Sequence, residues 1–278
     1  MKPLVLLSAA AGLCACTGAP GRSAPTPAPV AAVRIDGSAG VMPLVAALAR
    51  EYRALEPAVA IEMGGGMGTK ARVDALAQER IDIALASHGV VREEMASRGI
   101  AMHEIARVAV VFGVNASVPV TSLTRAQICD VYSGATTNWS RLGGPDVAIA
   151  ARTRPVAEVD ADVVSSGIAC FKGALAPAAA MVVEKPEEMA AALATTRGAI
   201  GMTSMPFVQQ SDGRIRAVAL DGVTPSAESI RSGGYALSRA SYLLTRATPA
   251  PAVARFLAFV RGPAGARIII ANGGVPVE

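Results

Sequence analysis

The sequence predicts an α/β protein in which strands alternate with helices around a largely parallel sheet. From Val33 onward, short apolar runs alternate with longer amphipathic stretches, which is typical of strands followed by helices. Hydrophobic residues make up 52% of the 278 residues and aromatic residues only 4%, so the core must consist mainly of Ala, Val, Leu, Ile and Met. This length allows one large domain or two of about 100 to 150 residues each.

The N-terminal segment predicts export. Lys2 precedes an apolar run over 4–13 that is too short to span a bilayer as a helix, so we expect a signal peptide over 1–15. The following segment, 16–32, is rich in Pro, Ala and Gly and has neither helical nor strand periodicity. It is expected to be a flexible tether ahead of the folded part.

Two cysteines lie where the signal peptide ends. Cys16 follows the small residue Ala15, as in bacterial lipoprotein processing sites, whereas Cys14 follows the bulky Leu13. We therefore expect lipidation at Cys16 and a periplasmic protein anchored by lipid to the cell envelope, with the choice of membrane left open. The alternative is an ordinary secretory signal with incidental cysteines.

Cys129 and Cys170 are the cysteines that remain in the mature part of the chain. In an oxidising compartment they could form a disulfide, but the sequence does not show whether their Cα atoms lie within bridging distance. Buried free thiols are the other interpretation, and both stay open at this point.

The first strand–loop–helix unit begins with a strand over 32–35 and a tight loop over 36–40. Pro43 then stands where the first turn of a helix tolerates proline. The apolar residues of this helix recur at helical spacing, at Leu44, Leu48 and Tyr52.

Two further strands end in loops of the same kind. The strand over 59–63 leads into the glycine-rich loop 64–68, after which Thr69 is expected to cap a helix. The strand over 81–86 ends at 87–89. The carboxyl ends of parallel strands share one edge of a sheet, where backbone N–H groups and helix N-termini converge. Glycines let the backbone approach a ligand there, so these loops predict a cleft for an oxyanion.

The chain then builds a second lobe. An apolar strand over 106–114 is expected to cross into it, and it is expected to return near Tyr235. The elements expected within it are a helix over 123–132, a strand over 147–151 and a helix within 186–195. A strand over 242–245 and a helix over 252–260 are expected to rejoin the first lobe. We expect a first lobe over 33–109 and 236–278, and a second lobe over 110–235.

Short motifs in this order resemble those of phosphate-type solute-binding proteins of ABC importers. In the first lobe they are Gly37-Ser38-Ala39-Gly40, Gly64 to Thr69, Asp82-Ile83 and Ala86-Ser87. In the second lobe and beyond they are Leu123-Thr124-Arg125-Ala126-Gln127, Tyr132-Ser133-Gly134, Asn138-Trp139, Gly198-Ala199-Ile200-Gly201 and Tyr235-Ala236-Leu237-Ser238-Arg239. The resemblance covers 33–278, and the order of the motifs is as informative as the motifs themselves.

The resemblance implies a type II periplasmic-binding-protein fold, with two α/β lobes, two crossover strands and a ligand cleft that closes by hinge motion. It implies a monomer that binds inorganic phosphate or a related oxyanion and delivers it to ABC permease subunits, without a cofactor. In such a family, hydroxyls, backbone N–H groups and an Arg replace the hydration shell of phosphate. The expected ligand-binding residues are Ser38, Ala39, Gly40, Gly68, Thr69, Ser87, His88, Arg152 and Arg154.

The chain departs from the family pattern at the expected site. Gly40 and Met67 stand where relatives carry hydroxyl residues, and His88 stands where they carry Asp or Arg. The Arg-x-x-x-Ser-Gly-Thr segment is replaced by 152–158. An alternative register places 160–162, Asp-Ala-Asp, at the cleft, which would suit a protonated or cation-bearing ligand.

Other functions have little support. His88 and His103 are the only histidines, there is no Gly-x-Ser-x-Gly motif, and the spacing within 64–70 is not that of a Walker loop, so we predict neither a catalytic residue nor a metal site. The net charge of +4 comes from scattered arginines, which argues against a nucleic-acid partner. The loss of hydroxyls leaves one alternative function, a sensor or envelope scaffold on the same fold.

Overall fold

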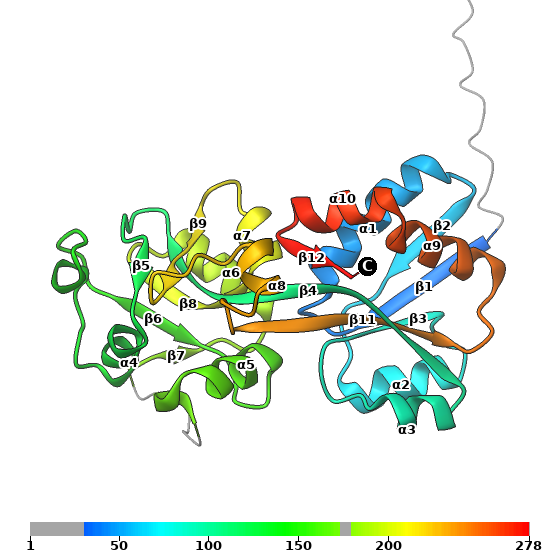
Figure 1. The fold of residues 1–278 in the computed structure, drawn as a ribbon, viewed down its shortest axis with the longest axis horizontal. Helices are drawn as coiled ribbons and strands as arrows, with labels where there is room; N and C mark the ends of the chain where they lie inside the picture. Colours follow the sequence, from blue (N-terminus) through cyan, green and yellow to red (C-terminus); the bar gives the residue numbers. More distant parts are fainter. Residues whose placement is uncertain (1–30, 173–178, 278) are drawn as a thin grey trace, which may run out of the picture.

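The computed structural model describes residues 31–172 and 179–277, and it shows two lobes side by side (Figure 1). The expected signal peptide, Cys16 and all but the last two residues of the expected tether lie outside the described residues. Within the described residues, none of the helices is long and apolar enough to cross a membrane.

The first lobe is a parallel sheet with the strand order β2-β1-β3, covered by helices. Its N-terminal elements are β1 (Ala31–Gly37), α1 (Met42–Leu55), β2 (Val59–Met63), α2 (Thr69–Ala77), β3 (Ile83–Ala86) and α3 (Arg92–Ser97). Its C-terminal elements are α9 (Pro251–Arg261), α10 (Pro263–Ala271) and β12 (Gly274–Pro276). Pro43 lies in the first turn of α1 as expected, because its fixed φ suits the start of a helix.

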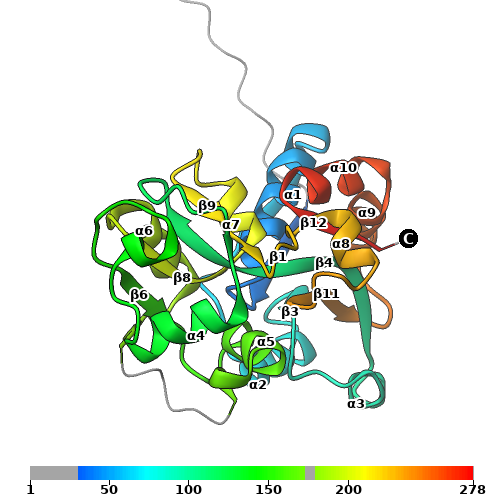
Figure 2. The ribbon, with the colours of Figure 1, turned by 60° about the vertical axis from the view of Figure 1, so that its left-hand side comes forward.

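Two long antiparallel strands connect the lobes. They are β4 (Ile100–Asn115) and β11 (Ser238–Arg246), and Arg239 of β11 pairs with Val108 of β4. Figures 1 and 2 show both strands running from one lobe into the other. The structure thus has the two crossover strands of the type II periplasmic-binding-protein fold. The expected lobe boundary at 109/110 falls inside β4, and the one at 235/236 falls just before β11.

The second lobe adds β8, β6 and β7 to β4. Its strands are β5 (Ser122–Leu123), β6 (Ala150–Thr153), β7 (Met181–Val182), β8 (Ala199–Ser204), β9 (Ile215–Ala217) and β10 (Ala219–Leu220). Its helices are α4 (Arg125–Ser133), α5 (Val159–Gly167), α6 (Pro186–Thr195), α7 (Met205–Gln209) and α8 (Ala227–Arg231), with short 3₁₀ turns at Trp139–Leu142 and Ala169–Phe171.

Each lobe has its own hydrophobic core. In the first lobe, Tyr52 of α1 packs against Phe256 and Phe259 of α9, with ring centroids 5.2 and 5.1 Å apart. In the second lobe, Trp139 is fully buried and its indole N–H donates to the Gly198 carbonyl at 2.8 Å. Truncating a buried aromatic residue of this kind to Ala costs roughly 3–5 kcal/mol.

Several predicted elements coincide with the structure, and others are shifted. The strand over 59–63 has the predicted bounds, and the helix predicted within 186–195 fills that range. The helix expected over 123–132 starts later, because Leu123 belongs to β5 and Thr124 caps α4 through a capping box. The strand expected over 147–151 also starts later, since the Ile149 N–H donates to the loop carbonyl of Thr137 rather than to a strand.

Cys129 and Cys170 form a disulfide, so the free-thiol interpretation was wrong. The S–S distance is 2.03 Å and the Cα atoms lie 5.9 Å apart. The bond closes a loop with a sequence separation of 41 that contains β6 and α5. In the chain-entropy view, a loop of this length stabilises the folded state by about 4 kcal/mol.

Candidate functional site

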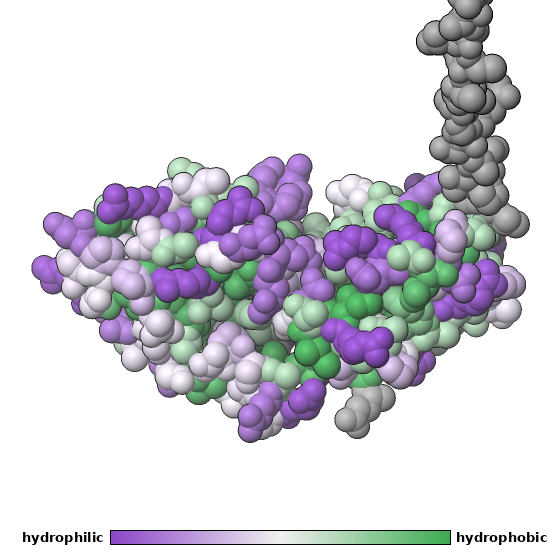
Figure 3. Space-filling view, turned by 90° about the horizontal axis from the view of Figure 1, so that it is seen from above, coloured by the Kyte–Doolittle hydropathy of each residue, from purple (hydrophilic) through white to green (hydrophobic). Residues whose placement is uncertain are grey.

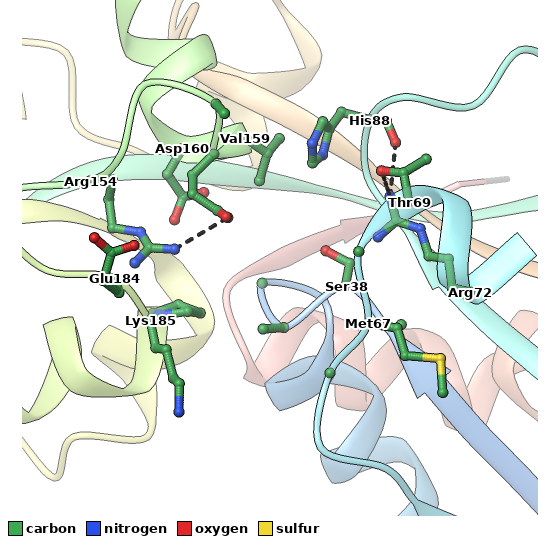
Figure 4. A pocket seen from close by; sticks show the side chains of 18 of the residues that line it. Ser38, Met67, Thr69, Arg72, His88, Arg154, Val159, Asp160, Glu184 and Lys185 are labelled. Atoms are coloured by element: carbon green, nitrogen blue, oxygen red, sulfur yellow. Dashed lines mark hydrogen bonds and ion pairs between the residues drawn. The ribbon is translucent and has the colours of Figure 1, made fainter. Parts of the chain in front are cut away.

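A cavity of about 390 Å³ lies between the lobes. On the first-lobe side it is lined by the loops that follow β1, β2 and β3, and on the second-lobe side by the segments that lead into α5 and α6. Seen from above, the surface is indented where the lobes meet (Figure 3). Figure 4 labels Ser38, Met67, Thr69, Arg72 and His88 on the first-lobe side, and Arg154, Val159, Asp160, Glu184 and Lys185 on the other.

The first-lobe loops are held together by one carboxylate. Asp36 Oδ1 accepts from the N–H of Gly37 at 2.6 Å and from the N–H of Gly66 at 2.9 Å. Gly37 has a φ of +136°, and a Cβ there would lie 2.5 Å from the Leu85 carbonyl oxygen, so no other residue fits. The predicted convergence of glycine loops at the carboxyl ends of strands is therefore present, and Asp36 joins two of them.

A short chain of polar groups follows these loops. Ser38 lines the cavity, and its hydroxyl lies 3.3 Å from that of Ser87, which in turn lies 3.5 Å from Nδ1 of His88. Ser87 was expected among the ligand-binding residues, but it is buried behind Ser38 and does not line the cavity. Its hydroxyl contacts instead orient two residues that do.

Arg72, on α2, was not predicted as a site residue. Arg72 is only 2% exposed and lines the cavity, and its Nη2 donates to Thr69 Oγ1 at 2.6 Å and to the His88 carbonyl at 3.2 Å. Its Nε has no hydrogen-bond partner among the described residues. Burial lowers the pKa of the guanidinium, which nevertheless remains a cation at neutral pH. An anion in the cavity would compensate this buried charge.

His88 lines the cavity as predicted, but in its neutral form. Burial and, after it, the nearby Arg72 lower the pKa of the imidazole below its ordinary value of 6.5. This favours a neutral ring at pH 7, so His88 would contact an oxyanion as a neutral group rather than as a cation. A neutral imidazole has one N–H to donate and one nitrogen to accept, so it still has hydrogen-bonding capacity.

On the second-lobe side, Arg154 lines the cavity and Arg152 does not. Arg152 lies within β6, where its Nη1 donates to the Ala151 carbonyl. Arg154 follows the end of that strand and is buried, with Nη1 donating to the Val183 carbonyl at 2.6 Å and Nη2 paired with Glu158 Oε2 at 3.3 Å. Its Nε has no partner within the described part of the chain.

The N-terminus of α5 carries acidic residues. Glu158 is the N-cap residue and Asp160 lies in the first turn, and both line the cavity. Asp160 is also one of the residues of the alternative register, whereas the exposed Asp162 does not line the cavity. The partial positive charge of a helix N-terminus is thus compensated by the chain itself.

A buried arginine on a crossover strand joins the two sides of the cavity. Arg239 Nε lies 3.2 Å from Asp160 Oδ1 of the second lobe, and Nη2 donates to the Gly40 carbonyl of the first lobe at 2.9 Å. A Cβ at Gly40 would lie 2.8 Å from that Nη2, so the glycine makes room for the guanidinium. This contact gives a physical reason for the missing hydroxyl residue at 40. In the sequence, Arg239 stood out only as the last residue of the motif over 235–239.

Seven of the nine expected residues therefore line one cavity, and Ser87 and Arg152 do not. The seven are Ser38, Ala39, Gly40, Gly68, Thr69, His88 and Arg154. No group of three His, Cys, Asp or Glu side chains suited to a metal ion occurs within 31–172 and 179–277.

Comparisons with known proteins agree with this architecture. A family model described as a PBP superfamily domain matches residues 22–263, which is most of the chain. The phosphate-binding protein PstS of Bacillus subtilis (strain 168) is 24% identical over 190 residues, which cover 67% of this chain and 61% of that protein. The chain thus spans less than two thirds of the length of this curated relative.

Two solved structures are similar over nearly their whole length. One is a putative phosphate ABC transporter substrate-binding protein with bound phosphate from Clostridium perfringens, with a TM-score of 0.73 and 26% identity, covering 89% of this chain and 100% of that chain. The other is an ABC-type phosphate transport receptor from Vibrio cholerae, with a TM-score of 0.59 and 26% identity, covering 87% and 99%. With its two lobes, crossover strands and interlobe cavity, the chain belongs to the PBP superfamily.

Proposed function

We propose that this chain is the substrate-binding component of an ABC importer and that it captures phosphate or a similar oxyanion in the cavity between its lobes. The observation that carries the proposal is a pair of buried guanidiniums, Arg72 and Arg154, which line the cavity from opposite lobes. Each keeps an Nε without a hydrogen-bond partner among the described residues. A tetrahedral oxyanion between them would compensate both charges.

The proposed ligand set combines neutral donors from one lobe with charge from both. Ser38, Thr69 and the backbone of the glycine loops would donate from the first lobe, close to the N-terminus of α2. Arg72 and Arg154 would supply charge-assisted hydrogen bonds, which are stronger than those between neutral groups. In this scheme Ser87 is a positioning residue, since its hydroxyl contacts the Ser38 hydroxyl and Nδ1 of His88 and does not line the cavity.

Closure of the cleft would couple binding to delivery. The two sides of the cavity belong to different lobes, so an anion that contacts both favours the conformation in which they approach. The closed form would be the one that ABC permease subunits recognise. A binding protein of this kind needs no catalytic residue, and we propose that the chain is a monomer without enzyme activity.

We propose further that the protein is periplasmic and held to the cell envelope by lipid on Cys16. The disulfide between Cys129 and Cys170 supports an oxidising compartment. The test is mass spectrometry of the full-length protein purified from membranes, with Cys16→Ser and Cys14→Ser as matched variants. Loss of the lipid only in Cys16→Ser is expected, and a protein released unmodified from the membrane would overturn the anchor.

The binding proposal is tested by isothermal titration of inorganic phosphate into the full-length protein. The protein is first unfolded and refolded, under oxidising conditions, in phosphate-free buffer with detergent, to remove carried ligand. We expect saturable binding at micromolar concentration or tighter. Arg154→Ala should weaken it about 30- to 1000-fold, roughly 2–4 kcal/mol, because the buried pair of guanidiniums then loses one member.

Arg152→Ala is the matched control, because Arg152 lies two residues away and does not line the cavity. It should leave phosphate affinity within about threefold of the unmodified protein. Arg154→Lys, which keeps the charge but loses the planar fork, covers the case in which Arg154→Ala does not fold. Equal losses in Arg152→Ala and Arg154→Ala, or the absence of phosphate binding by a folded protein, would overturn the proposal.

The alternative function, a sensor or envelope scaffold, is not favoured. It depended on the hydroxyls missing at Gly40 and Met67. At Gly40 the position is occupied by the Arg239 guanidinium rather than left empty. The similar proteins of Bacillus subtilis, Clostridium perfringens and Vibrio cholerae are described as phosphate-binding or phosphate-transport proteins.

A further inference from the structure

A second cavity of about 310 Å³ lies beside the first. We call it the side cavity, and its lining residues come from the loop after β1, α1, the glycine loop after β2, the start of α6, and α7 with the residue that follows it: Ala39, Met42, Pro43, Ala46, Gly64, Gly65, Glu187, Phe207 and Gln210. It therefore has walls from both lobes, as the main cavity does, and it opens on the α1 and α7 side of the molecule.

The two cavities adjoin each other and share part of their lining. Ala39, Gly65 and Glu187 line both. Ala39 has no side-chain atom beyond Cβ, and a Cβ added at Gly65 would meet nothing within 4 Å. Of these three shared residues Glu187 alone has a long side chain, so a ligand that extends from the main cavity into the side cavity would pass beside its carboxylate.

The side cavity has the chemistry of an apolar subsite. Met42, Pro43, Ala46 and Phe207 give it carbon-rich walls. Gln210 lies at its rim with its amide already engaged, donating to the Pro43 carbonyl at 3.2 Å and to Asn272 Oδ1 at 2.8 Å. Glu187 is the remaining polar side chain of the lining, and its carboxylate disfavours a second negative charge at the junction.

The combined size also argues for more than a bare oxyanion. The main cavity alone falls within the range of about 300–1000 Å³ that holds ligands of drug size, whereas inorganic phosphate is one phosphorus with four oxygens. A ligand that spans both cavities would place its anionic group at Arg72 and Arg154 and a carbon substituent against Phe207 and Met42.

We propose that the preferred ligand is an organic oxyanion, a phosphonate or phosphate monoester with a small uncharged apolar substituent, and that the side cavity binds this substituent. The inference rests on the proposed function, since the anionic group occupies the same site. It adds a specificity determinant, formed by α1 and α7, to the anion site.

The test compares phenylphosphonate, methylphosphonate and inorganic phosphate by titration into the full-length protein in detergent. Phenylphosphonate should bind at least about tenfold tighter than methylphosphonate, because its ring buries apolar surface in the side cavity. Ala46→Phe, at an exposed position of α1, should fill the side cavity and remove this preference while leaving the affinity for inorganic phosphate within about threefold. Ala254→Phe, at an exposed position of α9 away from both cavities, is the matched control.

The outcomes separate the two proposals. Tighter binding of phenylphosphonate that Ala46→Phe removes and Ala254→Phe retains supports the subsite. If phosphate and methylphosphonate bind but phenylphosphonate binds no tighter, the subsite is overturned and the anion site stands. If none of the three binds to a protein that unfolds cooperatively, the proposed function fails, and the subsite fails with it.

Discussion

The two sides of the main cavity are built in different ways. On the first-lobe side, glycine loops present backbone groups, and one carboxylate, Asp36, holds two of these loops through their N–H groups. On the second-lobe side, the contacts are ion pairs, the buried Arg154 with the partly exposed Glu158 and the buried Asp160 with the buried Arg239. The first side is set mainly by backbone geometry and holds one buried cation, Arg72, whereas the second depends on charges that must be paired to be buried.

This difference indicates where the chain is sensitive to substitution. A backbone cradle keeps its donors when the side chains that line it are exchanged, provided that the glycines and the Asp36 carboxylate remain. A network of buried charges fails when one member is removed, since the other member is left unpaired in a low-dielectric environment. We therefore expect the largest effects on the second-lobe side.

The largest expected effect is on the pair that joins the lobes. Asp160→Ala should lower the free energy of unfolding by roughly 3–5 kcal/mol, because the buried Arg239 loses its counter-charge. Asp162→Ala is the matched control, since Asp162 is an exposed acid of the same helix turn, and it should stay within about 1 kcal/mol. Denaturant unfolding measures both. Equal losses would show that the acidic first turn of α5 matters and the interlobe pair does not.

Next is the disulfide that encloses β6 and α5. The double variant Cys129→Ser/Cys170→Ser should lose about 2–5 kcal/mol of stability, and the loss should lie in the second lobe. Thermal unfolding with and without a reducing agent checks this. The reducing agent should destabilise the unmodified protein and leave the double variant unchanged. A reducing agent that destabilises both equally would mean that the effect does not come from this bond.

A smaller effect is expected on phosphate affinity at the N-terminus of α5. Glu158→Gln removes a partly exposed carboxylate from the cavity and should tighten phosphate binding about threefold to tenfold, since like charges then repel less. Glu93→Gln, at an exposed acid of α3 outside the cavity, serves as control and should change nothing. Weaker phosphate binding in Glu158→Gln would indicate that the positioning of Arg154 by its ion pair with Glu158 outweighs the repulsion between the Glu158 carboxylate and phosphate.

The smallest expected effect is on the pH dependence of stability. The folded pKa of His88 is lowered by burial and by Arg72, so the unfolded chain binds the proton more readily. The contribution of the neutral His88 ring to the free energy of unfolding is fully present above pH 6.5. It is lost as the pH falls from 6.5 through the pKa of His88 in the folded state. The slope for one proton is at most about 1.4 kcal/mol per pH unit.

Denaturant unfolding at pH 8, 6.5 and 5 measures this slope. His88→Gln should reduce it, and His103→Gln should reduce it separately, because burial also lowers the pKa of His103. Stability that rises on acidification of the unmodified protein over this range would contradict the assignment of a neutral His88.

Much of the fold could be predicted because its signals are local. The strand at 59–63 and the helix at 186–195 are set by apolar runs and by Pro186 at the helix start, all within a few residues. The glycine loops are also predictable from a local signal, the glycines themselves. Only a residue without a Cβ permits the close approach of Gly37 to Leu85. The loops after β1, β2 and β3 also supply most of the seven expected residues that line the main cavity.

What only the tertiary structure decided are the pairings between distant parts of the chain. Arg239 contacts residues 199 and 79 positions away, and the disulfide links positions separated by 41. Arg72 and Arg152 are both arginines within regular elements. Only the packing of α2 and β6 decides that Arg72 lines the cavity and Arg152 does not. Periodicity tells which face of an element is apolar, but the partner of a buried charge depends on which elements meet, and that is a property of the whole fold.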